Sequence, residues 1–355
     1  MAATAAPALP PVRVARAALA RFARDLLVAK GASAAHADIV VDHLIEADSM
    51  GLMSHGVMRV PQYLADIGAG DTDPRALPRV ARLAPGRAAV DGAWGFGQVV
   101  GAAMAAETAM LAAETGVAFV TGRHMGHTGR IGAYAEAIAA QGAVGVVVCA
   151  GPASGHFVAP FGGLQGRLTT NPIAFAYPSR DGPPVVADFS TSVAPEGVIR
   201  GLLRRGLPAP DGALRDARGA PTTDPAALYA TPPGALQPLG GAIGYRGTAL
   251  ALLVEVLAAL LAEDDTDDSR RRGSNLAMLA IATDDGFAAR AARMGEHVRS
   301  SPPIDAAAPV MLPGERERER ARRLGDGPIS VDQPTWRAMV GAAVAGIEVP
   351  EPLLE

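Results

Sequence analysis

The sequence predicts an α/β protein with a mixed or partly parallel sheet and helices at both ends of the chain. Short apolar segments typical of buried strands alternate with helical patterns through the middle of the chain, as where Val144–Cys149 follows Gly132–Gln141. Apolar residues at helical spacing dominate both chain ends. The 355 residues are enough for one large domain or for two to three modest ones.

The first part of the chain is predicted to be helical. Pro11–Lys30 carries an apolar stripe and stops at Gly31, which is a typical helix end. Ser33 is expected to cap a second helix that breaks near Ser49–Gly51. A third helix is expected from about Val57 to Ile67.

The middle of the chain alternates strands with helices, and the last part is again helical. The stretch from Leu202 to Pro238 is rich in Gly, Pro and Asp and is predicted to be mostly loop, and Glu263–Arg272 is predicted to be a solvated loop. We expect a mainly helical domain built from residues 12–75 and 296–355, a central α/β domain at 76–295, and a site in the cleft between them. The expected elements are a hairpin over Val80–Val90, helices over Gln98–Thr115, Gly132–Gln141, Thr248–Leu261, Glu315–Arg323 and Pro334–Ala345, and strands over Val117–Thr121, Val144–Cys149, Asn171–Tyr177, Val185–Phe189 and Leu276–Ile281.

Composition and charge exclude several classes of protein. The 32 basic and 36 acidic residues give a net charge of −4, so we expect no nucleic-acid partner and no attraction to anionic membranes. The single cysteine, Cys149, excludes a disulfide framework and a multi-cysteine metal site. The apolar run Leu250–Ala262 is interrupted by Glu255, and Met1–Ala20 lacks the apolar core of a signal peptide. A soluble cytoplasmic protein is the expectation.

A glycine cluster, Gly95–Gly101, opens the predicted helix after a possible strand. A dinucleotide fingerprint would need a small residue where Val100 stands and an acidic residue at the end of the next strand, near Thr121. Both are missing. The cluster is therefore better interpreted as a flexible entry to an Ala-rich helix, and a standard Rossmann fold is not predicted.

Two of the few histidines, His55 and His127, stand beside glycines at expected helix entrances, where the backbone can approach a small ligand closely. Imidazole is the usual proton donor or acceptor at physiological pH. Arg59 lies one helical turn after His55, where a guanidinium could hold a carboxylate. From residue chemistry alone, an anion-binding site and ordinary turn histidines with a surface arginine are equally good interpretations. The pair His124-x-x-His127 lacks a usual third ligand nearby, so we expect no metal.

Asp188 ends an apolar strand and is followed by three hydroxyl residues, Ser190, Thr191 and Ser192. Such hydroxyls can cap the following helix or hold phosphate oxygens, and capping is the better interpretation when they are taken alone. Thr169–Pro172 is typical of a turn that opens a strand. The chain lacks a Gly-x-Ser-x-Gly elbow, so a serine hydrolase is not predicted.

Seven segments, taken together and in this order, carry a resemblance to a known family. The segments are Asp48–Tyr63, His127–Tyr134, Thr170–Phe175, Asp188–Ser192, Pro221–Pro225, Gly244–Gly247 and Leu312–Glu315. They resemble the malate/L-lactate dehydrogenase family of the second type, which includes L-sulfolactate and ureidoglycolate dehydrogenases and cyclic-imine reductases. The resemblance covers the chain from about Val14 to Glu317.

The resemblance implies a NAD- or NADP-dependent oxidoreductase with a non-Rossmann fold of its own, which acts as a homodimer on a small 2-oxo or 2-hydroxy acid. It implies that His127 donates or accepts the proton, and that His55 and Arg59 lie at the substrate site. It also implies that Asp188–Ser190 and the residue at position 246 contact the dinucleotide. The predicted site comprises His127 and His55 as catalytic residues, Arg59, Ser54 and Thr170 as substrate-binding residues, and Gly151, Thr170, Asn171, Asp188, Phe189, Ser190, Arg246, Pro313, Gly314 and Glu315 as cofactor-binding residues.

Three positions depart from the usual pattern of this family. Arg246 replaces a lysine, and its larger planar guanidinium would disturb an ammonium-sized contact. Gly151 stands where members often carry Ser or Asn. Pro195 interrupts the helix expected after Ser192, at a cost of ~3 kcal/mol if it falls inside the helix rather than in its first turn.

Three functions stay open at this stage. The first is a dehydrogenase for a malate-like or lactate-like 2-hydroxy acid, which needs a hydride at the carbonyl carbon and a proton at its oxygen. The second is a reductase for a cyclic imine that carries a 2-carboxylate, because its C=N bond has the same planar setting. The third is a homologue that binds the dinucleotide without catalysis.

Overall fold

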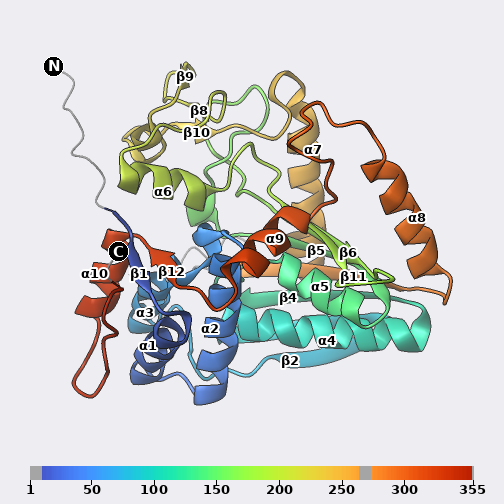
Figure 1. The fold of residues 1–355 in the computed structure, drawn as a ribbon, viewed down its shortest axis with the longest axis horizontal. Helices are drawn as coiled ribbons and strands as arrows, with labels where there is room; N and C mark the ends of the chain where they lie inside the picture. Colours follow the sequence, from blue (N-terminus) through green and yellow to red (C-terminus); the bar gives the residue numbers. More distant parts are fainter. Residues whose placement is uncertain (1–9, 264–272, 354–355) are drawn as a thin grey trace.

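The computed structural model describes residues 10–263 and 273–353, and its centre is a seven-stranded mixed sheet (Figure 1). Within this sheet, the pairing of β3 with β4 is parallel and the other five pairings are antiparallel. The mixed α/β architecture predicted from the sequence is confirmed. In spatial order the strands are β2 (Arg79–Ala84), β3 (Arg87–Gly95), β4 (Val117–Met125), β11 (Ser274–Ala282), β5 (Ala143–Ala150), β6 (Ile173–Tyr177) and β7 (Val185–Phe189).

Helices cover both faces of this sheet. Helices α4 (Gly97–Thr115) and α5 (Gly132–Ala140) pack on one face, where residues such as Val147 are fully buried. The next residue, Val148, points to the other face and packs with the helix that begins as α7 (Tyr245–Val254). This alternation is the side-chain period of a strand, and it explains why these strands are apolar throughout.

The two ends of the chain meet in a second core. The described N-terminal helices are α1 (Arg16–Ala29), α2 (Ala34–Ser49) and α3 (Val60–Ala69), and α10 (Gln333–Gly341) packs with them. A short antiparallel pair, β1 (Val12–Val14) with β12 (Ile329–Val331), ties the first described residues to the last part of the chain (Figure 1). Ser33 caps α2 as predicted, because its hydroxyl accepts a hydrogen bond from the backbone of His36.

The structure corrects the predicted start of the first helix. Residues 12–14 form strand β1, and α1 begins at Arg16. The third helix, α3, begins at Val60 and ends at Ala69, where Gly70 adopts the left-handed conformation (φ 77°) that ends many helices. Residues 53–55 and 57–59, between α2 and α3, form two single 3₁₀ turns.

The prediction that Leu202–Pro238 is mostly loop is wrong in part. Helix α6 (Glu196–Arg205) runs into it, and β8, β9 and β10 form a small three-stranded sheet within it. Pro195 precedes the first residue of α6 and so does not interrupt a helix, because a proline there loses no intrahelical bond. The bounds of the small strands are Leu214–Arg215, Pro221–Thr222 and Ala235–Leu236.

The sequence did not predict α8 (Phe287–Arg299), but it did predict α9 (Glu315–Leu324) and α10. The long helix predicted at Thr248–Leu261 begins earlier, at Tyr245, and its α-helical part ends at Val254. It continues as a π turn over 255–259 and a 3₁₀ turn over 260–262. The predicted charged loop Glu263–Arg272 lies, apart from its first residue, outside the described residues.

Candidate active site

The segment between α2 and α3 places Ser54, His55 and Arg59 on two successive 3₁₀ turns. His55 ends the first 3₁₀ turn, and Arg59 ends the second. Gly56 separates the two turns, and any side chain there would collide with Asp48, whose carboxylate oxygen lies 1.8 Å from the position a Cβ would take. The same carboxylate accepts a hydrogen bond from the backbone of Val57 at 2.8 Å. Asp48 and Gly56 therefore fix the direction of this segment.

Arg59 is held rigidly inside the protein. Its side chain donates from Nε to the carbonyl of Ser54 at 2.7 Å and from Nη1 to the Gln62 amide oxygen at 2.8 Å. The residue is only 7% exposed, and its Nη2 lies 3.0 Å from the point where a Cβ on Gly197 of α6 would stand. One edge of the guanidinium is thus used for anchoring, and the other faces α6, where only a glycine leaves room beside it.

His127 lies beside His55, with ring centroids 5.8 Å apart and nearly parallel rings. Its Nδ1 is 2.8 Å from the hydroxyl of Tyr63 and 3.3 Å from the backbone nitrogen of Gly129. The Nδ1 of His55 is 3.0 Å from the hydroxyl of Ser54. The structure therefore brings the predicted residues Ser54, His55 and His127 into one cluster, with Arg59 bonded to it through Ser54.

The surroundings keep both imidazoles neutral. Burial, followed by the positive charge of Arg59, lowers the pKa of His55 to about 3. The same two causes, in the same order, hold the pKa of His127 well below 6.5. At neutral pH each ring therefore has one protonated and one unprotonated nitrogen, and each can donate one hydrogen bond and accept another.

A cavity of about 880 Å³ opens beside this cluster. Ser54 and His55 line it on the helical side, and Thr170 and Asp188–Ser190 line it on the sheet side. Arg59 and His127 are not among its lining residues. They lie directly behind Ser54 and His55, and His127 keeps partial exposure. We name these two sides the helical wall and the sheet wall.

The sheet wall is built from the ends of β6 and β7. The backbone nitrogen of Thr191 donates to the carbonyl of Thr170 at 3.0 Å, which ties the two strand-end loops together. Asp188 accepts from the backbone nitrogen of Gly132, the first residue of α5, at 2.8 Å. The hydroxyl of Ser190 donates to the carbonyl of Ser192 at 2.9 Å. The hydroxyls of Ser190 and Ser192 bond within the turn, and that of Thr191 donates to the carbonyl of Thr170. Since α6 begins without a side-chain cap, the interpretation that these hydroxyls cap the following helix is wrong.

Asn171 is predicted to bind the cofactor, but its side chain faces α7. The residue is fully buried, and its amide donates to the carbonyl of Ala251 at 3.1 Å and to the Glu255 carboxylate at 2.8 Å. Glu255 begins the π turn that follows α7. Asn171 therefore holds that helix against the loop that carries Thr170.

The other predicted cofactor residues lie outside the lining of this cavity. Arg246 is exposed and lies over the Tyr245 ring, 5.7 Å from its centroid. The backbone nitrogen of Gly151 donates to the Thr169 hydroxyl at 3.3 Å. The segment Pro313–Glu315 lies against β7, since a Cβ on Gly314 would stand 2.7 Å from the carbonyl oxygen of Val186. Val186, the residue contacted, stands two positions before Asp188 in β7.

Two further residues of the cluster, Tyr63 and Gln98, are not predicted as site residues from the sequence. The amide nitrogen of Gln98 donates to the Tyr63 hydroxyl at 2.7 Å, and the hydroxyl in turn contacts His127. Tyr63 stands four residues after Arg59, so helical spacing could have placed both on one face. Gln98 lies in the glycine cluster that was interpreted only as a helix entry.

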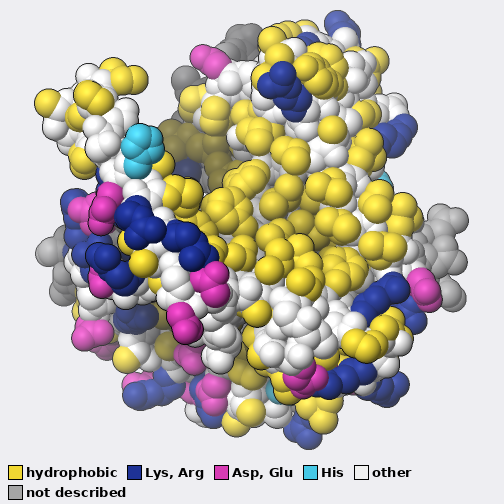
Figure 2. Space-filling model, turned by 90° about the vertical axis from the view of Figure 1, so that its right-hand side faces the viewer, with side chains coloured by type: hydrophobic (Ala, Val, Ile, Leu, Met, Phe, Trp, Pro, Cys, Tyr) yellow, Lys and Arg dark blue, Asp and Glu magenta, His cyan; other side chains and the backbone are white. Residues whose placement is uncertain are grey.

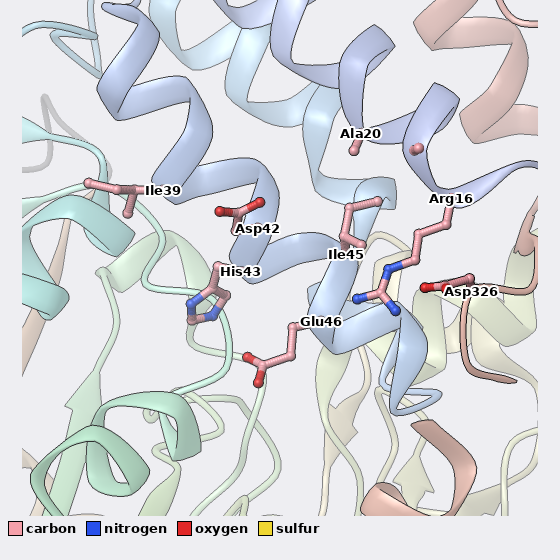
Figure 3. A pocket seen from close by; sticks show the side chains of 9 residues that line it. Arg16, Ala20, Ile39, Asp42, His43, Ile45, Glu46 and Asp326 are labelled. Atoms are coloured by element: carbon pink, nitrogen blue, oxygen red, sulfur yellow. The ribbon is translucent and has the colours of Figure 1, made fainter. Parts of the chain in front are cut away.

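A second cavity, of about 720 Å³, lies among α1, α2 and Asp326 (Figure 3). Its wall includes His43, whose Nε2 accepts from the backbone nitrogen of Arg130 at 2.8 Å, and Glu46, which forms an ion pair with Arg130 at 3.2 Å. Arg130 also lines the larger cavity. The backbone and side chain of Arg130 thus join the walls of the two cavities.

His124 is the other histidine of the His124-x-x-His127 pair. Its Nδ1 lies 3.1 Å from a carboxylate oxygen of Asp91, and its ring stacks on Trp94. Within residues 10–263 and 273–353, no three or more His, Cys, Asp or Glu side chains are grouped so that they could hold a metal ion.

The helix from Tyr245 to Ala262 is long and apolar enough to cross a membrane by length and composition. That criterion is weak, because core and interface helices of other proteins also satisfy it.

With its mixed sheet and a histidine–arginine cluster that faces the strand ends across a cavity, the molecule has the features of an oxidoreductase for small carboxylates. The malate/L-lactate dehydrogenase family matches residues 14–340, and the chain belongs to this family. An L-lactate dehydrogenase of Cupriavidus necator is 35% identical over 328 residues, which cover 89% of this chain and 93% of that protein.

Two further relatives show the range of the family. A Δ1-pyrroline-2-carboxylate reductase of Ancylobacter novellus is 36% identical over 270 residues, 75% of each chain. The solved structure of a malate dehydrogenase from Pyrococcus horikoshii superposes with a TM-score of 0.84 at 27% identity and covers 98% of this chain and 99% of that one. The family predicted from the seven sequence segments is therefore confirmed, and the solved structure shares the mixed α/β fold of this chain.

Proposed function

We propose that this chain is a NAD- or NADP-dependent dehydrogenase that interconverts a small 2-hydroxy acid and its 2-oxo acid. One observation carries the proposal: His55 lines a cavity whose opposite wall is the strand end at Asp188, and Arg59 and His127 lie next to Ser54 and His55 on the helical wall. The arrangement provides a carboxylate-binding cation, two neutral imidazoles and a wall of strand-end hydroxyls within one site.

Each residue of the cluster has a distinct part in this reaction. The free edge of Arg59 binds the substrate carboxylate, and its anchoring by Ser54 and Gln62 fixes the direction of that bond. His127 gives a proton to the carbonyl oxygen in reduction and takes it back in oxidation. His55, which lines the cavity, donates a hydrogen bond that polarises the same oxygen.

The sheet wall fits a dinucleotide. A cavity of about 880 Å³ is larger than a three-carbon acid needs, and it lies near the upper end of ordinary ligand sites. Thr170, Asp188, Phe189 and Ser190 would hold the cofactor, and a carboxylate and a hydroxyl there suit the hydroxyls of a ribose. When bound, the cofactor supplies or accepts the hydride. Because one sheet pair alone among the described strands is parallel, we further propose a dinucleotide-binding domain of non-Rossmann type at 76–295.

A second candidate is the reduction of a cyclic imine with a 2-carboxylate. The similarity to a Δ1-pyrroline-2-carboxylate reductase favours it, and the same cation and proton donor would serve a C=N bond beside a carboxylate. A third, a homologue without catalysis, would bind the dinucleotide and turn nothing over.

A substrate panel tests these candidates. Purified protein is mixed with NADH or NADPH, and cofactor fluorescence and oxidation are followed with pyruvate, oxaloacetate and a cyclic 2-carboxy imine. We expect binding of one cofactor and faster oxidation with an open-chain 2-oxo acid. Faster oxidation with the imine would favour the second candidate, and binding without turnover the third. Absence of cofactor binding would overturn the proposal.

We also propose that the enzyme is a cytoplasmic homodimer joined through the apolar side of the helix that begins at α7. Figure 2 shows hydrophobic side chains gathered on the face that lies at the right of Figure 1, the side of α7. A patch of this kind on a soluble protein marks an interface. Sedimentation analysis tests the stoichiometry. The exposed apolar residues of this helix are Leu252, Leu253, Val256, Leu260 and Leu261.

We propose, finally, that residues 12–75 and 296–355 form the helical domain. The support is the core that α1, α2 and α3 share with β12 and α10. Phe96 and Val99, from the central domain, also pack into this core, so the two domains share apolar contacts near the site.

A further inference from the structure

A buried chain of hydrogen bonds leads away from His127 on the side opposite to its Nε2. It joins three elements: Tyr63 on α3, Gln98 at the start of α4, and His127 in the loop after β4. Gln98 is 1% exposed and Tyr63 is 3% exposed. The two contacts, 2.7 Å from the Gln98 amide nitrogen to Oη and 2.8 Å from Oη to Nδ1, are both strong hydrogen-bond distances.

The direction of this chain follows from its ends. The amide nitrogen of Gln98 can only donate, so the oxygen of Tyr63 accepts from it and the hydroxyl proton of Tyr63 is directed to His127. The backbone nitrogen of Gly129 also donates toward the same Nδ1. Nδ1 is therefore an acceptor, and the neutral ring carries its proton on Nε2.

A neutral imidazole is a poor proton donor unless its other nitrogen gains a proton in the same event. Arg59 and burial prevent His127 from holding an additional proton at neutral pH, because they hold its pKa well below 6.5. The hydroxyl of Tyr63 contacts Nδ1 of His127, which is the only ring nitrogen that could gain a proton. The positive charge of Arg59 also favours an ionised Tyr63, although burial raises the pKa of Tyr63 to about 12 overall.

We propose that Tyr63 is the proton partner of His127 and that Gln98 holds Tyr63 in that role. As Nε2 gives its proton to the substrate oxygen, the hydroxyl proton of Tyr63 passes to Nδ1, so the imidazole stays neutral and Tyr63 becomes a phenolate. The Gln98 amide and the charge of Arg59 stabilise the phenolate. After the product leaves, water returns a proton to Nε2 and the Nδ1 proton returns to Tyr63. Oxidation runs through the same transfers in reverse.

This inference rests on the proposed function, but one of its tests does not need turnover. Protein labelled with ¹⁵N-histidine reports which nitrogen of His127 is protonated, and H127Q identifies the signal. We expect the Nε2–H form in the unmodified chain at pH 7 and a mixture of both forms in Tyr63→Phe, which keeps the ring and removes the hydroxyl. Equal forms in the unmodified chain, or a spectrum unchanged in Y63F, would overturn the relay even if the enzyme is active.

Kinetics supply the second readout. With the best substrate of the panel, Y63F should lose about 10²-fold in kcat with KM changed less than threefold, in line with the usual range for proton-transfer catalysis. Gln98→Met should lose less, on the order of tenfold, since the hydroxyl remains. The matched control is Y134F, which removes another buried hydroxyl, one that donates to the carbonyl of Thr128. A kcat within twofold of the unmodified enzyme in both Y63F and Q98M would contradict the relay.

The two readouts separate this inference from the proposed function. If the unmodified chain turns over no substrate but shows the expected histidine form, the proposed function fails, while the hydrogen-bond chain that sets the protonated nitrogen of His127 stands. If Y63F does not fold, judged by circular dichroism, Q98M decides in the same two measurements.

Discussion

The two walls of the cavity differ in which groups hold their side chains in place. The helical wall places ionisable side chains in a buried network, in which Arg59 and His127 are each held by short hydrogen bonds. The sheet wall uses strand ends, where Phe189 is 40% exposed and backbone groups hold Thr170 and Asp188 in place. Desolvation lowers the pKa values of both histidines on the first wall, and on the second wall it raises the pKa of the buried Asp188 carboxyl. We infer that the helical wall provides proton chemistry and substrate orientation, and that the sheet wall provides a shaped surface for the cofactor.

The largest effect that tests this division is expected at His127. H127Q keeps a hydrogen-bonding side chain of similar size but removes the group that we propose to transfer the proton. We expect kcat to fall by roughly 10²–10⁴-fold, while the dissociation constant for the cofactor stays within threefold. The control is H297Q, at an exposed position near the end of α8. A cofactor affinity that falls together with kcat would show that the two walls do not act separately.

Arg59 offers the next largest effect, on substrate binding. R59K keeps the positive charge but loses the planar edge that we propose to bind the substrate carboxylate, and it also loses the bonds to Ser54 and Gln62. We expect KM for the 2-oxo acid to rise about 10²-fold, in the range known for truncated buried charge pairs. R59Q, without the charge, should be weaker still. Equal KM values in R59K and the unmodified enzyme would remove Arg59 from the substrate site.

His43, which lies on α2 in the wall of the second cavity, predicts a dependence of stability on pH. Burial lowers the pKa of His43 from 6.5 to about 4, so between these values the unfolded chain binds more protons than the folded one. The free energy of unfolding should therefore fall as the pH drops from 6.5 to 4, by about 3 kcal/mol for this residue. Urea unfolding from pH 4.5 to 7.5 measures it. H43Q, which keeps an acceptor for Arg130, should reduce the slope and leave the curve above pH 6.5 parallel to that of the unmodified protein.

A large part of the fold, and the composition of the helical wall, could be predicted from the sequence. Local signals sufficed for Ser33 as a helix cap, for the continuous apolar strand β5 and for the helix at α9. The pairing of β1 with β12 could not be predicted, because each strand has three residues and more than 300 residues separate them. Pro195 was misread because proline both breaks helices and precedes them, and only the backbone decides between the two.

The site was predicted unevenly for a related reason. His55 and Arg59 are close in sequence, so spacing alone indicated that they act together. The contact of His127 with Tyr63 joins residues 64 apart, and that of Tyr63 with Gln98 joins residues 35 apart. Such contacts depend on how α3 and α4 pack. Asn171 shows the opposite case, in which a polar residue beside a predicted site serves α7 instead.

The smallest expected effect is at Asp188, and it sharpens the comparison from the sheet side. D188N keeps an oxygen that can accept from the backbone of Gly132, whereas D188A leaves that nitrogen without its partner. We expect both variants to weaken cofactor binding about tenfold, each by the loss of one charged hydrogen bond. D188A should in addition lower the free energy of unfolding by about 1–3 kcal/mol, the penalty of an unpaired buried donor. Fluorescence titration with NADH or NADPH and urea unfolding measure the two effects. Because Asp188 belongs to the sheet wall, the kcat of D188N at saturating cofactor should stay within threefold, and a loss as large as that of H127Q would mean that the strand end takes part in the proton chemistry.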